Sequence, residues 1–229
     1  MNLSGIILVD KPIGWSSFDV VAKIRGILRT EVLEKTGEKR KIKVGHTGTL
    51  DPQATGLMIV VVGDYCKRAQ EFSKLDKTYQ VQMKLGESST TGDSEGEKTP
   101  GPEVEITEGK LKDVLDSFLG ESMQTPPIYS AIKINGQRAY KLARAGKEVK
   151  LEPRPIKIYD IKLDKFNPPL IDFIVSVSSG TYIRSLVEDI AKKLGTVGYM
   201  TRLERTVVGK YSLQKAIKVE QISSEYIET

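Results

Sequence analysis

The chemistry of this 229-residue chain is most visible in the segment Gly45-His-Thr-Gly-Thr-Leu-Asp-Pro-Gln-Ala-Thr-Gly56, which surrounds one carboxylate with glycine and threonine. An ionised carboxylate that is held in place can act as a nucleophile or as a base, and Asp51 could serve either role. Pro52 biases Asp51 toward an extended backbone, and the glycines permit a ligand to approach closely. Composition alone leaves a structural turn and a site built on Asp51 equally open.

The rest of the sequence excludes several familiar kinds of site. It contains one cysteine, Cys66, and one histidine, His46, which excludes an intramolecular disulfide and a zinc site of the usual Cys/His kind. No nucleophile motif lies beside His46, as Ser-His-Asp or Cys-His chemistry would require. The glycine-rich phosphate-loop and dinucleotide-binding patterns are both absent. The remaining candidates are carboxylates, tyrosines and arginines, with no metal.

Charge is distributed unevenly along the chain, whose formal net charge is +5. Residues 87–108 carry seven acidic side chains and one lysine, whereas residues 133–157 carry eight basic side chains and two glutamates. A basic segment of this density fits a surface that contacts phosphates. On charge alone, a solvated face without a ligand is equally plausible.

The elements that must position these residues are predicted from apolar periodicity. Strands are predicted at residues 4–9, 57–62, 77–85, 156–166, 171–178 and 197–208, and helices from Ser16 or Ser17 onward and at residues 106–119, 139–145 and 180–194. Residues 44–56 are predicted to form an ordered loop. Residues 30–40 are predicted to form an exposed loop, and the acidic residues 86–105 a loop with high mobility.

The first helix is predicted to face the core through residues at the helical period, namely Phe18, Val21, Ala22, Ile24 and Leu28. The content is mixed without regular βαβ alternation, which favours the α+β class over a doubly wound sheet. We expect one catalytic domain over residues 1–229, with a mixed or antiparallel central sheet flanked by helices. No apolar run reaches the length of a membrane helix, and the start of the chain lacks the features of a signal peptide. A cytoplasmic protein without membrane contact is therefore expected.

The segment around Asp51 resembles the catalytic motif of the TruB family of tRNA pseudouridine-55 synthases. Further motifs of this family follow in family order over essentially the whole chain: Asp10-Lys-Pro-x-Gly-x-Ser-Ser17, Lys77-Thr-Tyr79, Thr91-Gly-Asp93, Pro126-Pro-x-Tyr-Ser-Ala-x-Lys133, Gly180-Thr-Tyr-Ile-Arg-Ser-Leu186 and Leu203-x-Arg-Thr-x-x-Gly209. The resemblance implies the pseudouridine synthase fold and isomerisation of a flipped-out uridine at position 55, in the T loop of tRNA. That reaction is redox-neutral and implies no cofactor.

The resemblance also implies roles for single residues. Asp51 would be the catalytic carboxylate and Arg184 its ion-pair partner, since a nearby guanidinium favours the ionised carboxylate. Tyr79 would stack on the uracil and assist removal of the C5 proton. Tyr182 and Leu203 would line the same pocket.

Two further residues are interpreted less directly. A lone histidine is more often structural than functional, but the resemblance favours an RNA contact around the flipped base for His46, without a part in acid–base catalysis. Asp93 matches a family motif but falls in the predicted acidic loop, which favours a loop position over a site role.

Residues 124–152, approximately, match a basic insertion of the family that closes over the T loop like a thumb. Lys133 and Arg144 are predicted to contact phosphates there. For Tyr129 and Tyr140, stacking on RNA and ordinary packing stay equally open.

The chain stops at Thr229, where most bacterial members would begin a C-terminal RNA-binding domain of the PUA type. Without a PUA domain, affinity is expected to rest on the thumb and the T arm of tRNA, with the protein acting as a monomer that needs no obligatory protein partner. The alternatives are a guide-RNA-dependent pseudouridine synthase, a tRNA-folding chaperone that binds the T arm, and a structural RNA-binding module. An intact set of catalytic residues favours the enzyme over the last two.

Overall fold

The computed structural model describes residues 3–130, 132–134, 136–146 and 149–229, without the side chains at positions 133, 134, 140 and 144. The chain divides into two compact units, which are described separately. Unit 1 comprises Met1–Gln80 and Leu203–Thr229, and unit 2 comprises Val81–Arg202. Two strands, β4 (Lys77–Leu85) and β12 (Gly198–Val208), have residues in both units.

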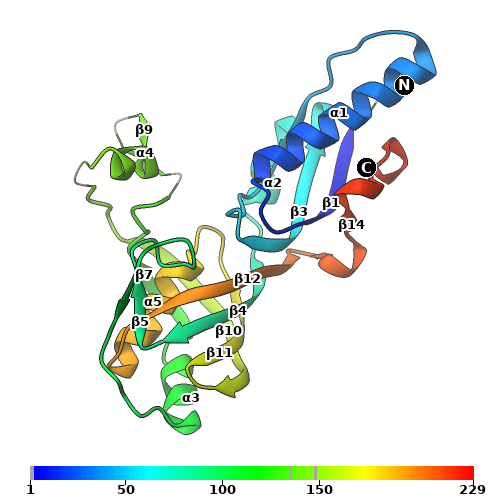
Figure 1. Cartoon of the computed structure of the whole chain (residues 1–229). Coiled ribbons are helices and arrows are strands. Elements are labelled where there is room, and N and C mark those ends of the chain that lie inside the picture. Colours follow the sequence, from blue (N-terminus) through cyan, green and yellow to red (C-terminus); the bar gives the residue numbers. More distant parts are fainter. Residues whose placement is uncertain (1–2, 131, 135, 147–148) are drawn as a thin grey trace. The chain divides into compact units, whose positions relative to one another are not determined.

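Unit 1 is built on a mixed β-sheet (Figure 1). Besides β12, its strands are β1 Gly5–Lys11, β2 Val44–His46, β3 Ala54–Val62, β13 Tyr211–Ser212 and β14 Ile217–Lys218. Their hydrogen-bonded order is β14-β1-β3-β12, with β2 beside β3 and β13 beside β12. β1 is antiparallel to β3, whereas β3 is parallel to β12, so the sheet is mixed.

Strand β3 is apolar along its length because both of its faces are covered. Successive side chains point to opposite faces: Val60 lies in a cluster with α1 (Ser17–Thr36), whereas Ile59 lies in a second cluster with Phe72. The remaining short helices of unit 1 are η1 Gly63–Arg68, α2 Ala69–Ser73, η2 Leu213–Lys215, η3 Val219–Gln221 and η4 Ser224–Tyr226.

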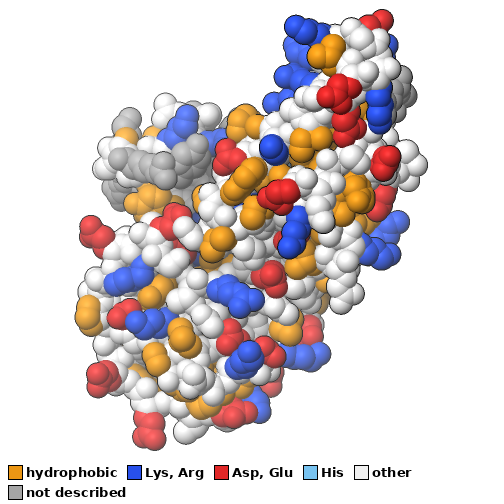
Figure 2. All heavy atoms as spheres, turned by 45° about the vertical axis from the view of Figure 1, so that its right-hand side comes forward, with side chains coloured by type: hydrophobic (Ala, Val, Ile, Leu, Met, Phe, Trp, Pro, Cys, Tyr) orange, Lys and Arg blue, Asp and Glu red, His pale blue; other side chains and the backbone are white. Residues whose placement is uncertain are grey.

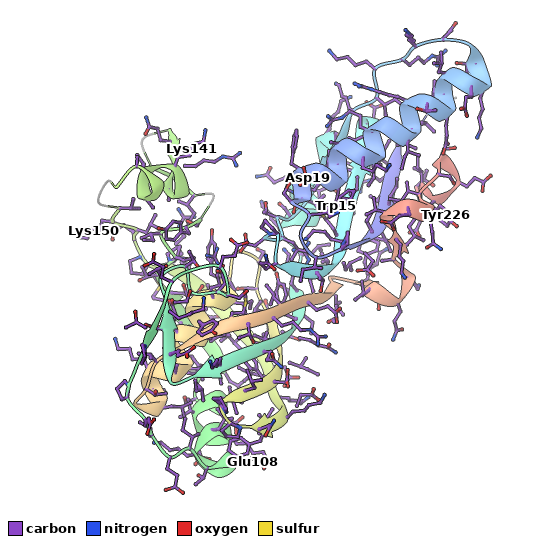
Figure 3. All side chains as sticks on the ribbon, viewed as in Figure 1. Trp15, Asp19, Glu108, Lys141, Lys150 and Tyr226 are labelled. Atoms are coloured by element: carbon purple, nitrogen blue, oxygen red, sulfur yellow. The ribbon has the colours of Figure 1, made fainter. Side chains whose placement is uncertain are left out.

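Helix α1 differs from its prediction in two respects. It begins as predicted, with a capping box between Ser16 and Asp19, and Figure 3 labels Asp19 near the start of the helix. The helix then continues through the predicted loop to Thr36. The reason is that Val32 extends the buried stripe one turn beyond Leu28. The stripe also excludes Phe18, whose side chain is 66% exposed, and the exposed Ala22. The prediction that these two residues face the core was therefore wrong.

Unit 2 contains a sheet in which β4 is followed by β11, β10 and β7. The bounds of its elements are β5 Glu87–Ser89, β6 Lys98–Pro100, α3 Glu108–Asp116, β7 Gly120–Gln124, β10 Arg154–Asn167, β11 Leu170–Val177 and α5 Ile183–Leu194. The predicted strand 77–85 coincides with β4, which alternates buried and more exposed residues. Helix α5 buries one face, including Leu186, Val187, Ile190 and Leu194, and α3 packs against α5 and β10.

The predicted loop 86–105 is instead a β-hairpin formed by β5 and β6. Its turn is closed by hydrogen bonds such as Thr90 N to Glu97 O at 3.1 Å. The acidic composition predicts a mobile loop, which was wrong here: strand pairing orders the segment, and Asp93 within it is only 7% exposed. Between β7 and β10 lie β8 Lys133–Ile134, β9 Gln137–Arg138 and α4 Ala139–Arg144, within the predicted thumb.

A sheet with both antiparallel and parallel strand pairs, together with the helices packed on it, confirms the α+β class. Among the residues that the structure describes, no helix is both long enough and apolar enough to cross a membrane. The extent of a single catalytic domain over residues 1–229 stays a prediction.

Replacing glycine with alanine is expected to have opposite effects on stability at two positions of unit 1. Gly56→Ala should lower the free energy of unfolding by about 3 kcal/mol or more. Gly56 has φ +96°, and an added Cβ would lie 2.4 Å from the Arg205 carbonyl oxygen. Gly26→Ala should raise the free energy of unfolding by about 0.5–1 kcal/mol, because Gly26 lies inside α1 with open space around the position of a Cβ. Urea unfolding of the three proteins measures both changes, and a Gly56→Ala variant as stable as wild type would contradict this account.

Candidate active site

Asp51 lies in the loop between β2 and β3, residues 47–53, called here the Asp51 loop. The Asp51 carbonyl accepts a hydrogen bond from Ala54 N at 3.0 Å, which closes a turn at the start of β3. At the other end, Thr47 donates from both N and Oγ1 to the carbonyl oxygen of Ile59, at 3.1 and 3.2 Å. Both ends of the loop are therefore tied to β3.

Ser17, the first residue of α1, fixes the residue before Asp51. Its buried hydroxyl accepts a hydrogen bond from Leu50 N at 2.8 Å and donates to Leu50 O at 3.0 Å. Both backbone groups of Leu50 are thus satisfied by one side chain, as a buried loop requires.

Lys11, at the end of β1, holds the residue after Asp51 although no part of its side chain is exposed. Its ammonium donates to the carbonyl oxygens of Trp15 at 2.6 Å, Pro12 at 2.9 Å and Pro52 at 3.3 Å. Burial lowers the pKa of Lys11 to about 8, while the nearby Asp51 carboxylate raises it. Lys11 therefore tethers the Asp51 loop and is also electrostatically coupled to Asp51.

Arg205, on β12, connects the Asp51 loop with the strand that follows it. The guanidinium is 2% exposed and donates from Nε to Leu57 O at 2.7 Å and from Nη2 to Gly48 O at 3.1 Å. A Cβ at Gly48 would lie 3.4 Å from Nη1 of Arg205, so a larger residue would crowd the guanidinium. One side chain thus reaches the backbone on both sides of Asp51.

Lys77, at the start of β4, is a third buried cation in unit 1. Its ammonium donates to Ser73 O at 2.6 Å and also to the carbonyl oxygen of Leu75. Burial, followed by repulsion from Arg205, lowers the pKa of Lys77 to about 8. Because Arg205 also lowers the pKa of Lys11, the three cations influence one another.

His46 and Leu203 come from two strands, β2 and β12, that pair with the same edge of β3, the edge opposite β1. His46 is the last residue of β2 and pairs with Val60; its Nδ1 is buried, with no hydrogen-bond partner among the described residues. Burial first, and the Arg205 charge second, lower its pKa below 6.5. Leu203 on β12 is 9% exposed and lies opposite Ala54, directly after the Asp51 loop.

Tyr79 occupies β4 with 8% of its surface exposed. The neighbouring carbonyl of Thr78 accepts a hydrogen bond from Thr206 Oγ1 of β12 at 3.3 Å. Tyr79 is therefore held by strand pairing rather than by a loop.

Arg184 and Tyr182 belong to unit 2, at the start of α5. The guanidinium of Arg184 is buried and lies 3.6 Å from the Asp93 carboxylate. It donates to the carbonyl oxygens of Thr91 and Tyr129, both at 2.9 Å. The Asp93 carboxylate also accepts a hydrogen bond from the Thr91 hydroxyl. The ion pair of Arg184 with Asp51, implied by the resemblance, stays a prediction.

Gln124 of β7 holds the backbone of Tyr182. Its side-chain amide accepts a hydrogen bond from Tyr182 N at 2.8 Å and donates to Tyr182 O at 3.0 Å. This reciprocal pair fixes the residue that caps α5.

Sequence reasoning missed the buried cations Lys11 and Arg205 beside the Asp51 loop, and the burial of Asp93 beside Arg184 in unit 2. All three stand in the motifs that carry the resemblance, and this was the available signal. Charged side chains are rarely fully buried, so the sequence pattern alone gave these three residues no role in the core.

The predicted phosphate contacts, Lys133 and Arg144, have side chains that lie outside the described part of the structure. A cavity of about 770 Å³ in unit 1, lined by Tyr65, Phe72 and Tyr211 among others, contains none of the predicted site residues.

The chain matches two family models that together cover residues 34–229. Residues 34–183 match the TruB family pseudouridylate synthase (N terminal domain), and residues 184–229 match the tRNA pseudouridylate synthase B C-terminal domain. The chain is 43% identical to tRNA pseudouridine synthase B of Aquifex aeolicus (strain VF5) over 227 residues, which are 97% of this chain and 75% of that protein. It is 40% identical to tRNA pseudouridine synthase B of Chlorobaculum tepidum over 221 residues, 96% of this chain and 89% of that protein.

Solved structures are similar to this chain as well. The crystal structure of a Cbf5-Nop10-Gar1 complex contains a chain that is 28% identical, with a TM-score of 0.71 over 96% of this chain. A structure of an H/ACA RNP bound to a substrate RNA containing 2′-deoxyuridine contains one that is 27% identical, with a TM-score of 0.67 over 94% of this chain. This chain spans about half of the length of each, 53% and 51%. The match confirms the predicted pseudouridine synthase fold.

The single histidine provides a direct test of the electrostatics around Arg205. By NMR titration, we expect a pKa below 6.5 for His46 in wild type and a higher value in Arg205→Gln, because one of the two causes of the shift is removed. Arg205→Lys keeps the charge and should stay close to wild type. Since the unfolded chain binds its proton at higher pH than the folded one, the stability from His46 is present above pH 6.5 and is lost as the pH falls through its folded pKa. An unshifted wild-type value of 6.5 would contradict the burial of His46.

Asp93→Asn tests the Arg184–Asp93 contact. The substitution removes the carboxylate that faces a buried guanidinium, so the free energy of unfolding should fall by about 3 kcal/mol in urea. Glu95→Gln is the matched control, because Glu95 is exposed on the same hairpin, and it should change stability by less than about 0.5 kcal/mol. Equal effects of the two substitutions would show that the contact contributes nothing specific.

Proposed function

The chain belongs to the TruB family of pseudouridylate synthases, and we propose that it converts the uridine at position 55, in the T loop of tRNA, to pseudouridine. It is an isomerase of tRNA uridine, in keeping with relatives named tRNA pseudouridine synthase B at 40–43% identity over nearly the whole chain. The observation that carries the proposal is the Asp51 loop, in which Ser17, Lys11 and Arg205 fix the backbone around one carboxylate.

The reaction exchanges one bond to the ribose for another within the same nucleotide. The bond between N1 of uracil and C1′ breaks, the base turns, and C5 forms a bond with C1′ while the C5 proton leaves and N1 gains a proton. The Asp51 carboxylate starts the reaction, either as a nucleophile at C1′ or as a base toward a ribose proton. Because the Asp51 loop is already fixed by hydrogen bonds, little reorganisation is needed when the nucleotide arrives.

Other residues hold the flipped base and the carboxylate in place. Tyr79 stacks on the uracil and assists loss of the C5 proton, and Tyr182 and Leu203 line the pocket. Arg184 supplies positive charge to Asp51. His46 contacts the RNA around the vacated position, because unstacking a base leaves a space that the enzyme must occupy or hold open.

The partner in this proposal is the T arm of tRNA. Lys133 and Arg144 of the thumb contact its phosphates, and the protein acts as a monomer, without a guide RNA or an obligatory protein partner, in the cytoplasm. The support is that the motifs for catalysis all lie within one chain. The relatives named tRNA pseudouridine synthase B are also more similar to it, at 40–43% identity, than the chains of the Cbf5 and H/ACA complexes, at 27–28%.

The proposal is tested by tritium release from tRNA transcript labelled at C5 of uridine. Wild type should turn over this substrate without any guide RNA. Asp51→Asn keeps the shape of the side chain and removes its charge, so the rate should fall by at least about a thousandfold. Asp116→Asn, at the end of α3, is the control and should retain wild-type turnover. Absence of turnover by wild type together with tight tRNA binding would reject the proposal in favour of a chaperone.

A further inference from the structure

A short stretch of unit 1 carries an excess of positive charge, as residues 133–157 of unit 2 also do. Residues 23–43 contain eight cationic side chains and three carboxylates, a net charge of +5, which equals that of the whole chain. The other 208 residues are balanced, with 27 cations and 27 carboxylates. This stretch forms most of α1 and the loop of residues 37–43 that leads into β2. The cations of residues 23–43 therefore lie close together in space, on α1 and the loop that follows it.

Apart from Arg25, which donates to the Val44 carbonyl oxygen at 3.0 Å, the cations of this stretch are exposed, because the opposite side of α1 is buried. α1 packs its apolar stripe, which includes Ile24 and Leu28, against the sheet. Figure 2 shows blue side chains gathered at the end of unit 1 where α1 finishes. We name six exposed members the basic surface: Lys23, Arg29, Lys39, Arg40, Lys41 and Lys43.

Few carboxylates neutralise the basic surface. Arg40 pairs with Glu38 at 2.8 Å, while Glu31 accepts a hydrogen bond from Ser224 N at 2.9 Å. Within the described part of the chain, no carboxylate lies within ion-pair distance of Lys39 or Lys41. The basic surface thus keeps most of its charge for an external anion.

The composition of the loop identifies the kind of anion. Its one apolar side chain, Ile42, is only 9% exposed, so the loop offers solvent no apolar group. Protein interfaces place apolar and aromatic side chains at their centre, and helices on membrane surfaces need an apolar face. Charge without apolar contact is what the phosphate backbone of a nucleic acid requires.

The basic surface is continuous with the strand that carries His46. Lys43 immediately precedes β2, and His46 lies three positions further along the extended strand, a distance of about 10 Å. We propose that the basic surface contacts the phosphate backbone of the RNA double helix that continues from the T loop. This inference rests on the proposed function, which places the T loop at His46 and Asp51. It adds to the thumb a second surface for phosphates, on unit 1.

The test neutralises three cations of the loop together, in Lys39→Gln/Arg40→Gln/Lys41→Gln. KM for tRNA transcript should rise by about tenfold or more while kcat changes little, because these side chains are remote from the reacting atoms. The plot of log Kd against log salt concentration should become less steep by about 2–3, one contact being worth about 0.9 on a double helix. Thermal unfolding should be unchanged, since the loop side chains are exposed.

The matched control is Lys112→Gln/Lys165→Gln/Lys192→Gln, which removes the same charge from exposed positions of unit 2. It should leave KM and the salt dependence close to wild type. If both triple variants weaken binding equally, the effect is one of net charge and the proposal is overturned. If neither does, the basic surface serves solubility alone and the proposal is overturned as well.

The inference is separated from the proposed function by comparing full tRNA with an isolated T-arm hairpin, and by measuring both turnover and direct binding. A larger KM on both full tRNA and an isolated T-arm hairpin supports a contact with the stem of the T arm, and an effect on full tRNA alone supports a contact with the helix beyond it. Direct titration of tRNA binding does not need turnover. An inactive wild type would therefore reject the proposed function, while a changed salt slope in the loop variant would still support the RNA contact.

Discussion

The structure of unit 1 depends on hydrogen bonds to the polar backbone groups of the Asp51 loop, which belongs to neither a helix nor a strand. The polar groups of the Asp51 loop are bonded by Ser17 from α1, Lys11 from β1 and Arg205 from β12. An unpaired backbone group away from water costs about as much as a lost hydrogen bond. The three elements must therefore be assembled before the loop reaches its final form, and Asp51 is positioned by the fold as a whole rather than by its neighbours in sequence.

The same requirement explains why unit 1 buries cations. A lysine or arginine reaches carbonyl oxygens that no short side chain could reach, and each ammonium or guanidinium can bond several of them. The cost is desolvation, visible in the pKa of about 8 for both Lys11 and Lys77. Mutual repulsion through Arg205 adds to this cost, while attraction between Lys11 and Asp51 offsets part of it. The carboxylate proposed for catalysis thus also stabilises the cation that holds its own loop.

The limits of prediction from sequence follow from these interactions. Strand β4 was predicted correctly because alternation reports a half-buried strand directly. Helix α1 was cut short because residues 30–40 are rich in charge, although Val32 continues its buried stripe. Charge also led to the prediction of a mobile loop around Asp93. The motif around Asp51 identified the loop, but the roles of Lys11 and Arg205 were not predictable from it. The contacts that tie the loop, from Lys11 to Pro52 and from Arg205 to Gly48, join residues far apart in sequence.

In both units, predicted site residues are held by contacts within their own unit. Within unit 2, Gln124 holds Tyr182 through a reciprocal pair of hydrogen bonds, and Asp93 faces Arg184. Within unit 1, the register of β12 on β3 sets Leu203 opposite Ala54. Backbone segments held in this way lose little entropy when a ligand binds. Under the proposed function, binding energy from phosphate contacts is then available for extracting the uridine from its stack rather than for ordering the protein.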